Sequence, residues 1–224
     1  MTIELIADHC DWLIVNKPAG ISMQMEQEEP SAISLQQQVE AQFNIPKAYP
    51  VHRLDKVTSG LVIFAKSVAA AAAFGELFTN KAIEKYYVAL ASGKPKKKQG
   101  WIKGDMEKGR NGSWLLQRSM NNPALTYFQS VAIDTDSFIA NRLYLLQPKT
   151  GKTHQLRVAM KSLGTAILGD QRYKGESAER CYLHAFHLQF IWQGKSFRYT
   201  ALPHQGHWPE LKEVELLERF FSTQ

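Results

Sequence analysis

The sequence predicts an α+β domain, and three observations support this prediction. Short apolar runs rich in β-branched residues are mixed with helix-forming segments, without a regular strand–helix–strand rhythm. Hydrophobic residues make up 44% of the chain and charged residues 21%, as in an ordinary soluble globular protein. No repeat and no Gly/Ser-rich linker divides the 224 residues. We therefore expect one domain over residues 1–224, large enough to bury a core.

In the first half of the chain, turn residues and helix caps set the expected boundaries. An apolar run at 13–15 ends where Asn16–Gly20 supplies turn residues. Ser31 and Ser67 each precede a run of helix formers and are expected to cap a helix. The run over 60–65 lacks alternation, which is typical of a strand covered on both faces. The expected elements are strands at 13–15, 60–65 and 82–91, helices over 31–43 and 68–80, and a polar loop at 24–30.

In the second half, β-rich runs are separated by turn residues. Asp134–Ser137 separates two runs that we predict as paired strands, and Gln193–Lys195 turns a long strand back on itself. Gly164 ends a helical pattern that starts at His154. Residues 101–123 are rich in Gly, Asn and charge, which favours hairpins and loops. The expected elements are strands at 126–133, 139–146, 183–192 and 196–200, and helices over 154–163 and 211–221.

The formal charge of +6, from 27 Lys and Arg against 21 Asp and Glu, leaves the class of partner open. Clustered positive charge would favour a polyanion such as RNA, but basic proteins of other classes have the same balance. Cys10 and Cys181 are far apart and outside any CxxC motif. We expect two reduced thiols in a cytoplasmic protein, not a disulfide scaffold or a zinc ribbon. Residues 1–5 do not resemble a secretory signal, and the apolar stretch 69–74 is too short to span a membrane.

The segment His52–Gly60 contains the most informative polar cluster. Asp55 lies between two basic residues, Arg53 and Lys56, close to Thr58 and directly before the predicted buried strand. A loop anchored in this way is a common place for catalytic residues. A surface turn held by local side-chain hydrogen bonds accounts for the same residues equally well. The spacing alone leaves both interpretations open.

Other catalytic motifs fail on spacing. Gly151-Lys152-Thr153 suggests a phosphate-binding P-loop, but the glycine required five positions earlier is Leu146, so we reject nucleotide hydrolysis. No Gly-x-Ser-x-Gly elbow occurs. The His pairs at 184 and 187 and at 204 and 207 lack the His-Glu-x-x-His pattern, so we expect no metal site. The basic run over 94–110, with Trp101 and Trp114, suits either phosphate contact with stacking or a solvated loop.

Six ordered segments together resemble the RluA-type family of RNA pseudouridine synthases. The residues His52-Arg53-Leu54-Asp55, with Thr58-Ser59-Gly60 and Ala65-Lys66, resemble the family signature around its catalytic aspartate. The match runs in order from about Leu5 to about Pro203. The other segments are Asn16-Lys17-Pro18-Ala19-Gly20, Lys85-Tyr86-Tyr87-Val88-Ala89, Thr150-Gly151-Lys152-Thr153-His154-Gln155-Leu156-Arg157, Ile167-Leu168-Gly169-Asp170 with Tyr173, and Leu183-His184-Ala185.

The resemblance implies the pseudouridine synthase fold, a mostly antiparallel mixed sheet flanked by helices with a central RNA-binding cleft. It implies an enzyme that isomerises uridine in rRNA or tRNA to pseudouridine, with Asp55 as the catalytic residue and the target base flipped out of its stack. By the family's motifs, Arg157 pairs with that aspartate, Tyr87 lies beside the target base and Leu183 lines the uracil pocket. Further candidates for substrate binding are His52, Arg53 and Thr58.

The resemblance also bears on cofactors and partners. Because the isomerisation involves neither a redox change nor hydrolysis, it implies no metal and no organic cofactor. The expected partner is a stem-loop of rRNA or tRNA, with no membrane and no obligate protein partner, and we expect a monomer. An S4-type RNA-binding domain, present in many relatives, is not expected, since the motifs begin near residue 13.

Three departures from the family pattern concern the choice of substrate. Lys152 stands where arginine is commoner, Ala159 replaces a frequent histidine, and the stretch after Gly20 lacks the usual His-Pro. Two other functions compete with the synthase: a non-catalytic RNA-binding module, and a hydrolase that uses Asp55 with His52. The presence of Asp55 counts against the module, and the missing metal ligands and serine elbow count against the hydrolase.

Overall fold

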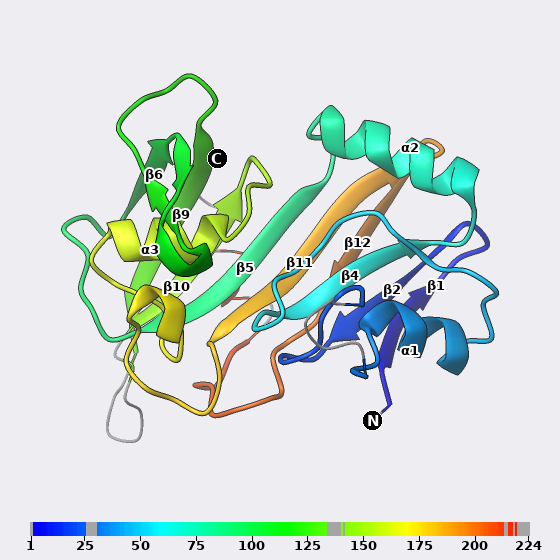
Figure 1. Ribbon diagram of the computed structural model, residues 1–224, viewed down its shortest axis with the longest axis horizontal. Coiled ribbons are helices and arrows are strands. Elements are labelled where there is room, and N and C mark those ends of the chain that lie inside the picture. Colours follow the sequence, from blue (N-terminus) through cyan, green and yellow to red (C-terminus); the bar gives the residue numbers. More distant parts are fainter. Residues whose placement is uncertain are drawn as a thin grey trace. The chain divides into compact units, whose positions relative to one another are not determined.

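The computed structural model describes residues 2–25, 31–133, 140, 142–212, 215–216 and 218. Strands and helices are mixed along it as the α+β class requires, which confirms that prediction (Figure 1). By its contacts the chain divides into two compact units: Met1–Glu84 with Ala185–Pro203, and Lys85–His184 with His204–Gln224. The prediction of one domain over the whole chain stays a prediction.

The first unit is built on a largely antiparallel sheet. Strand β2 pairs with β1 on one side and with β4 on the other, β3 adds to β4, β11 follows β4, and β12 pairs with β11. The strands predicted at 13–15, 60–65, 183–192 and 196–200 are thereby confirmed. The sequence does not predict β1, because all five of its residues are exposed or half-buried. The strands are β1 (Glu4–Asp8), β2 (Trp12–Lys17), β3 (Tyr49–Pro50), β4 (Ser59–Ala65), β11 (Leu183–Trp192) and β12 (Lys195–Thr200).

Two helices belong to this unit, α1 (Leu35–Gln42) and α2 (Val68–Thr79). Ser67 caps α2 by accepting a hydrogen bond from the backbone of the third helical residue, as predicted. The predicted start of α1 at Ser31 is wrong. Ser34 is the N-cap, because its side chain and that of Gln37 satisfy each other's backbone N–H groups.

Aromatic packing dominates the core of the first unit. Phe74 of α2 stacks on Trp192 with ring centres 4.4 Å apart and meets Phe190 edge-on at 5.5 Å. Trp12 meets Phe190 edge-on from β2. All seven residues of β4 are buried, which confirms a strand covered on both faces. Each large buried side chain contributes about 1.5–3 kcal/mol through its removal from water, so β4 is held firmly at the point where the Asp55 segment enters it.

The second unit contains the strands β5-β10-β9-β6, paired antiparallel in that order, and a small hairpin of β7 and β8. The predicted strand 82–91 and the predicted pairing of 126–133 with 139–146 are confirmed; the turn predicted at 134–137 lies outside the described residues. Within 101–123, where the sequence predicts hairpins and loops, β7 and β8 form a hairpin as predicted. The strand β6 was not predicted; it pairs with β9 at the edge of the sheet. The strands are β5 (Glu84–Ala91), β6 (Gln99–Gly104), β7 (Met106–Lys108), β8 (Trp114–Leu116), β9 (Ala124–Ala132) and β10 (Arg142–Pro148).

Helix α3 (Gln155–Ser162) covers one face of this sheet (Figure 1). The amide of Gln155 donates to the hydroxyl of Thr126 at 3.0 Å, which fixes the start of the helix on β9. Short 3₁₀ turns occur at Arg110–Gly112 and Gln171–Tyr173. Of the helix predicted over 211–221, residues 211 and 212 are not helical, 215, 216 and 218 are, and the rest lie outside the described ranges. No helix in the described ranges is long and apolar enough to cross a membrane.

Candidate active site

Asp55 lies on the loop between β3 and β4 and is half-buried. Its backbone carbonyl accepts a hydrogen bond from the N–H of Thr58 at 3.0 Å, which closes a tight turn. Thr58 itself is buried, with 2% of its surface exposed, and leads directly into β4. The carboxylate is therefore carried by a short turn on a rigid strand.

A fully buried lysine, Lys17, is hydrogen-bonded to the backbone of this turn. The ammonium of Lys17, at the end of β2, donates to the carbonyls of Pro18 at 2.9 Å, Lys56 at 3.2 Å and Thr58 at 2.7 Å. An ammonium has three hydrogens, and three carbonyls on the turn and the neighbouring segment receive them. Burying a charge is costly unless it is fully hydrogen-bonded. Gly20 adds a further tie, because its N–H donates to the carbonyl of Lys56 at 2.7 Å.

Gly60, the second residue of β4, has a backbone that only glycine adopts without strain. Its φ is +117°, and a Cβ built on it would lie 2.3 Å from the carbonyl oxygen of Ala185 in β11. The absence of a side chain therefore lets β11 approach β4 closely five residues after Asp55. This close approach fixes where the turn leaves the sheet.

The other predicted residues of this loop have different settings. His52 accepts a hydrogen bond at Nε2 from the N–H of Ile63 at 3.0 Å, and its ring packs on Phe78 with centres 5.3 Å apart. Its Nε2 therefore carries no proton and is engaged by the backbone of β4. Arg53 is exposed to solvent. His52 thus supports the loop, which further weakens the hydrolase interpretation.

In the second unit Tyr87 lies on β5 and is buried, with 7% of its surface exposed. Tyr87 pairs with Leu146, and Leu146 pairs with Phe128, so these three side chains lie on one face of the sheet. Thr126, two residues before Phe128, lies on the same face. Because α3 is bound to Thr126, Tyr87 lies on the sheet face that α3 covers. Burial lowers the pKa of Lys85, two residues before Tyr87.

Arg157, on α3, forms a two-point ion pair with Asp170. Its Nε donates to Oδ2 at 2.7 Å and its Nη2 to Oδ1 at 2.8 Å, and both side chains are almost completely buried. Bidentate pairs of this kind fix the plane of the guanidinium. The predicted pairing of Arg157 with Asp55 stays a prediction. Leu183, the first residue of β11, is buried with 3% exposed, and its contact with a base likewise stays a prediction.

A tyrosine connects this ion pair to a neighbouring hairpin. The ring of Tyr173 lies 5.1 Å from the guanidinium carbon of Arg157. Its hydroxyl accepts from the backbone N–H of Trp114 at 3.0 Å and lies 2.9 Å from Nδ1 of His154. His154 was predicted as the first helical residue, but it precedes α3 as its N-cap, with a left-handed backbone at φ +56°. Arg157 is thus held by an ion pair at one end and an aromatic ring on its face.

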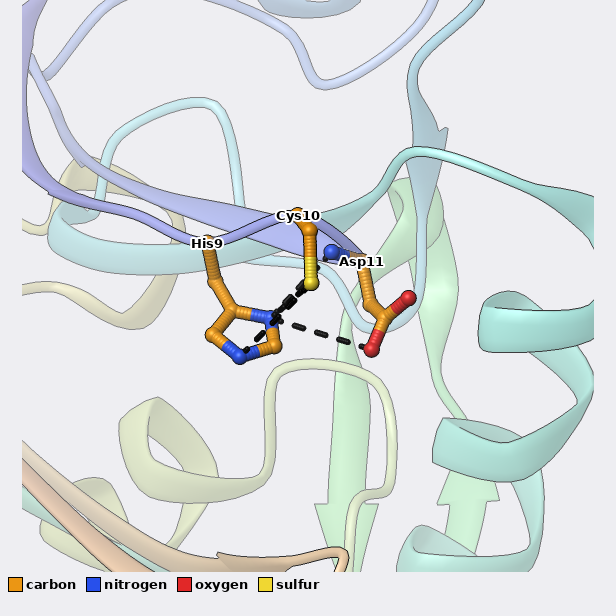
Figure 2. A group of neighbouring side chains, drawn as sticks. All are labelled: His9, Cys10 and Asp11. Carbon is orange, nitrogen blue, oxygen red and sulfur yellow. Dashed lines mark hydrogen bonds and ion pairs between the residues drawn. The ribbon is translucent and has the colours of Figure 1, made fainter.

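Outside these segments, His9, Cys10 and Asp11 gather three possible metal ligands within 4.8 Å in the turn between β1 and β2 (Figure 2). Hydrogen bonds already account for their arrangement. Nδ1 of His9 accepts from the N–H of Asp11 at 3.2 Å, and Oδ2 of Asp11 accepts from Trp192 and Gln193 at 3.0 and 3.2 Å. The cluster is therefore the closed turn of a hairpin. Both cysteines of the chain are free thiols.

Comparison with known proteins decides the family. A family model described as RNA pseudouridylate synthase matches residues 11–162, well over half of the chain. The chain belongs to the RNA pseudouridylate synthase family. The synthase is 50% identical over 208 residues to an uncharacterized RNA pseudouridine synthase of Haemophilus influenzae, a match that covers 92% of this chain and 90% of the relative. Family membership and the names of the relatives make it an RNA pseudouridine synthase.

More distant relatives differ in length. The synthase is 32% identical over 194 residues to ribosomal large subunit pseudouridine synthase C of Rickettsia bellii. The match covers 81% of this chain but only 61% of that relative. It therefore spans less than two thirds of the length of that protein. The solved structure of human RNA pseudouridylate synthase domain containing 1 aligns with a TM-score of 0.79 at 23% identity, over 99% of this chain and 96% of that one. This likeness shows the pseudouridine synthase fold.

Three residues of the synthase that shape the site were not predicted in their roles. Lys17 belongs to a family motif, and its place at the end of an apolar strand is a further signal, because lysine is almost never fully buried unless it is paired. Asp170 also belongs to a family motif, but no spacing rule links it to Arg157. The support of Arg157 by Tyr173 is a tertiary contact and leaves no local signal in the sequence.

Proposed function

We propose that Asp55 is the catalytic carboxylate with which the synthase isomerises a specific uridine of rRNA or tRNA to pseudouridine. The observation that supports this assignment best is the anchoring of its turn. Lys17, which is fully buried, binds the carbonyls of Lys56 and Thr58 in the turn, and the turn leads into β4, all of whose residues are buried. A half-buried carboxylate held in one position is what a covalent or general-base step requires.

The reaction breaks the bond between the sugar and N1 of uracil, rotates the base, and forms a bond from the same sugar carbon to C5. The proton on C5 leaves, and N1 gains one, so the product is an isomer of the substrate. A carboxylate can attack the sugar or the ring, or act as a base at the sugar. For each of these steps Asp55 must be ionised, and we propose Arg157 as its counter-ion. A guanidinium can serve two carboxylates, and Asp170 would hold it in the required plane.

A uridine inside an RNA helix or stack cannot be reached, so the base must be flipped out at a cost of a few kcal/mol. We propose that Tyr87 stacks on the flipped uracil and that Leu183 closes its other side. Arg53, which is exposed, would hold the opened RNA backbone. His52 and Thr58 would contribute to substrate binding by fixing the conformation of the Asp55 loop. His52 binds the backbone of β4, and the N–H of Thr58 closes the turn.

The test uses RNA without modifications. Transcripts of large-subunit rRNA and of tRNA are incubated with the wild type and with Asp55→Asn, and pseudouridine is mapped at each uridine. The rRNA is tested first, because several relatives are named ribosomal large subunit pseudouridine synthases. We expect one or a few sites that appear with the wild type and are missing with Asp55→Asn. Sites that form equally well without the carboxylate would remove Asp55 from the mechanism.

Two further variants separate the supporting roles. Arg157→Ala also breaks the buried pair with Asp170, so it is assayed at a temperature at which circular dichroism shows it folded. Under those conditions it should lose most turnover and keep RNA binding, and near-normal turnover would remove Arg157 from the mechanism. Tyr87→Phe keeps the ring and should keep most activity if Tyr87 acts by stacking, whereas Tyr87→Ala should not. If both Tyr87 variants are equally inactive, the hydroxyl has a chemical role that stacking does not include.

A further inference from the structure

A pocket of about 400 Å³ lies in the second unit beside the start of α3 and is not used by the reaction proposed above. Its size falls within the range of roughly 300–1,000 Å³ that is usual for small-molecule sites. The walls come from the β7–β8 hairpin, the segment after it and the residues directly before α3. The lining residues are Asp105, Met106, Trp114, Asn121, Asn122, Gly151, Lys152 and Thr153.

The pocket combines an aromatic surface, a cation and hydrogen-bonding groups. Trp114 is half-buried, and the ammonium of Lys108 lies 6.0 Å from its ring centre. Lys152 donates one of its three hydrogens to the side-chain oxygen of Asn122 at 2.8 Å. A Cβ added to Gly151 would meet nothing within 4 Å, so the space above this residue is open. An aromatic ring and a lysine in one pocket are the combination that binds an unpaired nucleotide.

Asp105 makes one side of the pocket acidic, and this favours a ligand that has a base as well as a phosphate. Both carboxylate oxygens of Asp105 accept backbone hydrogen bonds, from Asn121 at 2.9 Å and from Asn122 at 2.8 Å. A carboxylate repels phosphate but accepts hydrogen bonds from the edge of a base. A bound nucleotide would use all three groups if its base edge faced Asp105, its base stacked on Trp114 and its phosphate lay toward Lys152.

The pocket is tied to the arginine of the active site. The backbone N–H of Trp114 donates to the hydroxyl of Tyr173, and the ring of Tyr173 lies against Arg157. Trp101, with the Lys103 ammonium 5.3 Å from its ring centre, forms a second aromatic and basic surface. Among the described residues, no hydrogen bond or ring contact of Trp101 leads to Arg157. Trp101 pairs with Tyr127, one residue from Phe128, so it lies on the sheet face opposite Tyr87.

We propose that this pocket binds an unpaired nucleotide of the substrate RNA, stacked on Trp114 and held at its phosphate by Lys152. The nucleotide is a neighbour of the target uridine in the loop, and the pocket contributes to the choice of substrate. The proposal rests on the proposed function, because it takes the ligand to be the RNA that the synthase modifies. The departure from arginine at position 152 then tunes a substrate contact and leaves the chemistry unchanged.

The first measurement is of binding alone. The probe is a fluorescein-labelled single-stranded RNA of mixed sequence and about 12 nucleotides, a length within the roughly 4–16 nucleotides that one OB-fold domain covers. Trp114→Leu should raise its Kd about tenfold, the loss expected from one stacked base, and Trp114→Phe should restore most of the affinity. Trp101→Leu is the matched control and should change the Kd less than about twofold. Because Tyr173 is bound by the backbone of Trp114, that bond does not depend on the tryptophan side chain.

The second measurement is of turnover on the modified transcript. Trp114→Leu and Lys152→Ala should raise KM and leave kcat near that of the wild type, since they touch no reacting atom. Lys103→Ala is the control for a lost surface charge. Equal Kd values for wild type and Trp114→Leu, or an equal loss in Trp101→Leu, would overturn the proposal. Unchanged pseudouridine formation by Asp55→Asn would refute the proposed function while the binding comparison still stands.

Discussion

Arg157 and Asp170 form a buried, two-point ion pair whose two contacts measure 2.7 and 2.8 Å. Arg157, which the family resemblance pairs with Asp55, thus has a carboxylate partner within its own unit. The position of the guanidinium is therefore set before any substrate arrives. Asp170 and the ring of Tyr173 act on Arg157 as positioning residues.

Asp170→Asn should be strongly destabilising. The change leaves a buried guanidinium without its charge partner, and breaking a buried pair from one side costs about 3–5 kcal/mol. The free energy of unfolding in urea measures this loss. The double variant Arg157→Leu with Asp170→Leu removes both charges and should recover much of the stability without recovering activity. Stability of Asp170→Asn within about 1 kcal/mol of wild type, the size expected for an exposed pair, would contradict a buried, structural role for the pair.

Lys17→Met keeps the length of the side chain and removes its charge. Three carbonyls on the Asp55 turn and the neighbouring segment then lose a donor, at about 1–3 kcal/mol for each buried acceptor left unsatisfied. We expect a loss of about 3 kcal/mol or more, and a lower kcat with RNA binding unchanged. Lys66→Met is the matched control, because Lys66 pairs with the largely exposed Asp8. Such pairs contribute about 0–1 kcal/mol. Equal losses in the two variants would show that the three carbonyl contacts contribute no more than one surface ion pair.

Gly60→Ala and Gly20→Ala separate strain from steric overlap. Both glycines have positive φ, +117° and +89°, so each substitution strains the backbone by about 1–3 kcal/mol. Only at Gly60 would the new Cβ overlap a neighbour, the carbonyl of Ala185. Thermal unfolding should therefore show a larger loss for Gly60→Ala, together with reduced turnover. A milder effect at position 60 than at position 20 would mean that β4 and β11 separate at little cost.

The lowered pKa of Glu179 predicts a pH-dependent contribution to the free energy of unfolding. A hydrogen bond from Tyr182, followed by one from the backbone of His207, lowers the pKa of its carboxyl below its ordinary value of 4.5. A lowered pKa means that the folded state favours the charged form, so the contribution is full above about pH 4.5 and is lost as the pH falls through the folded pKa. Glu179→Gln should be less stable than wild type in urea at pH 7, and the difference should vanish in acid. Glu176→Gln, at an exposed position, is the control. A difference that persists unchanged to low pH would rule out the carboxylate as its source.

Much of the fold followed from local signals in the sequence. Ser67 stands directly before a run of alanines, and α2 begins where that pattern predicts. At α1 two serines compete, and the capping-box spacing from Ser34 to Gln37 selects the later one over Ser31. The capping-box rule, applied to both serines, predicts that α1 begins after Ser34.

The site was less accessible to sequence analysis because its contacts are tertiary. Asp55 stood out through its neighbours, but Asp170 lies 13 residues after Arg157, across the end of a helix, and no periodicity relates the two. Lys17 sits at the end of an apolar strand, where burial rules disfavour lysine. Its burial is explained by hydrogen bonds to three carbonyls, one of them 41 positions later in the sequence. Only the folded chain brings these groups together.

The span of those Lys17 contacts links catalysis to the order of folding. Its bonds to Lys56 and Thr58 close loops of 39 and 41 residues, so they form only after β2 has found β4. Loop closure of that length is an entropic cost that local structure does not offset early in folding. A partly folded or newly synthesised chain therefore has the sequence of the Asp55 turn without its shape. Competence to act on RNA should consequently appear together with the completed β2–β4 pairing, as a late and cooperative event.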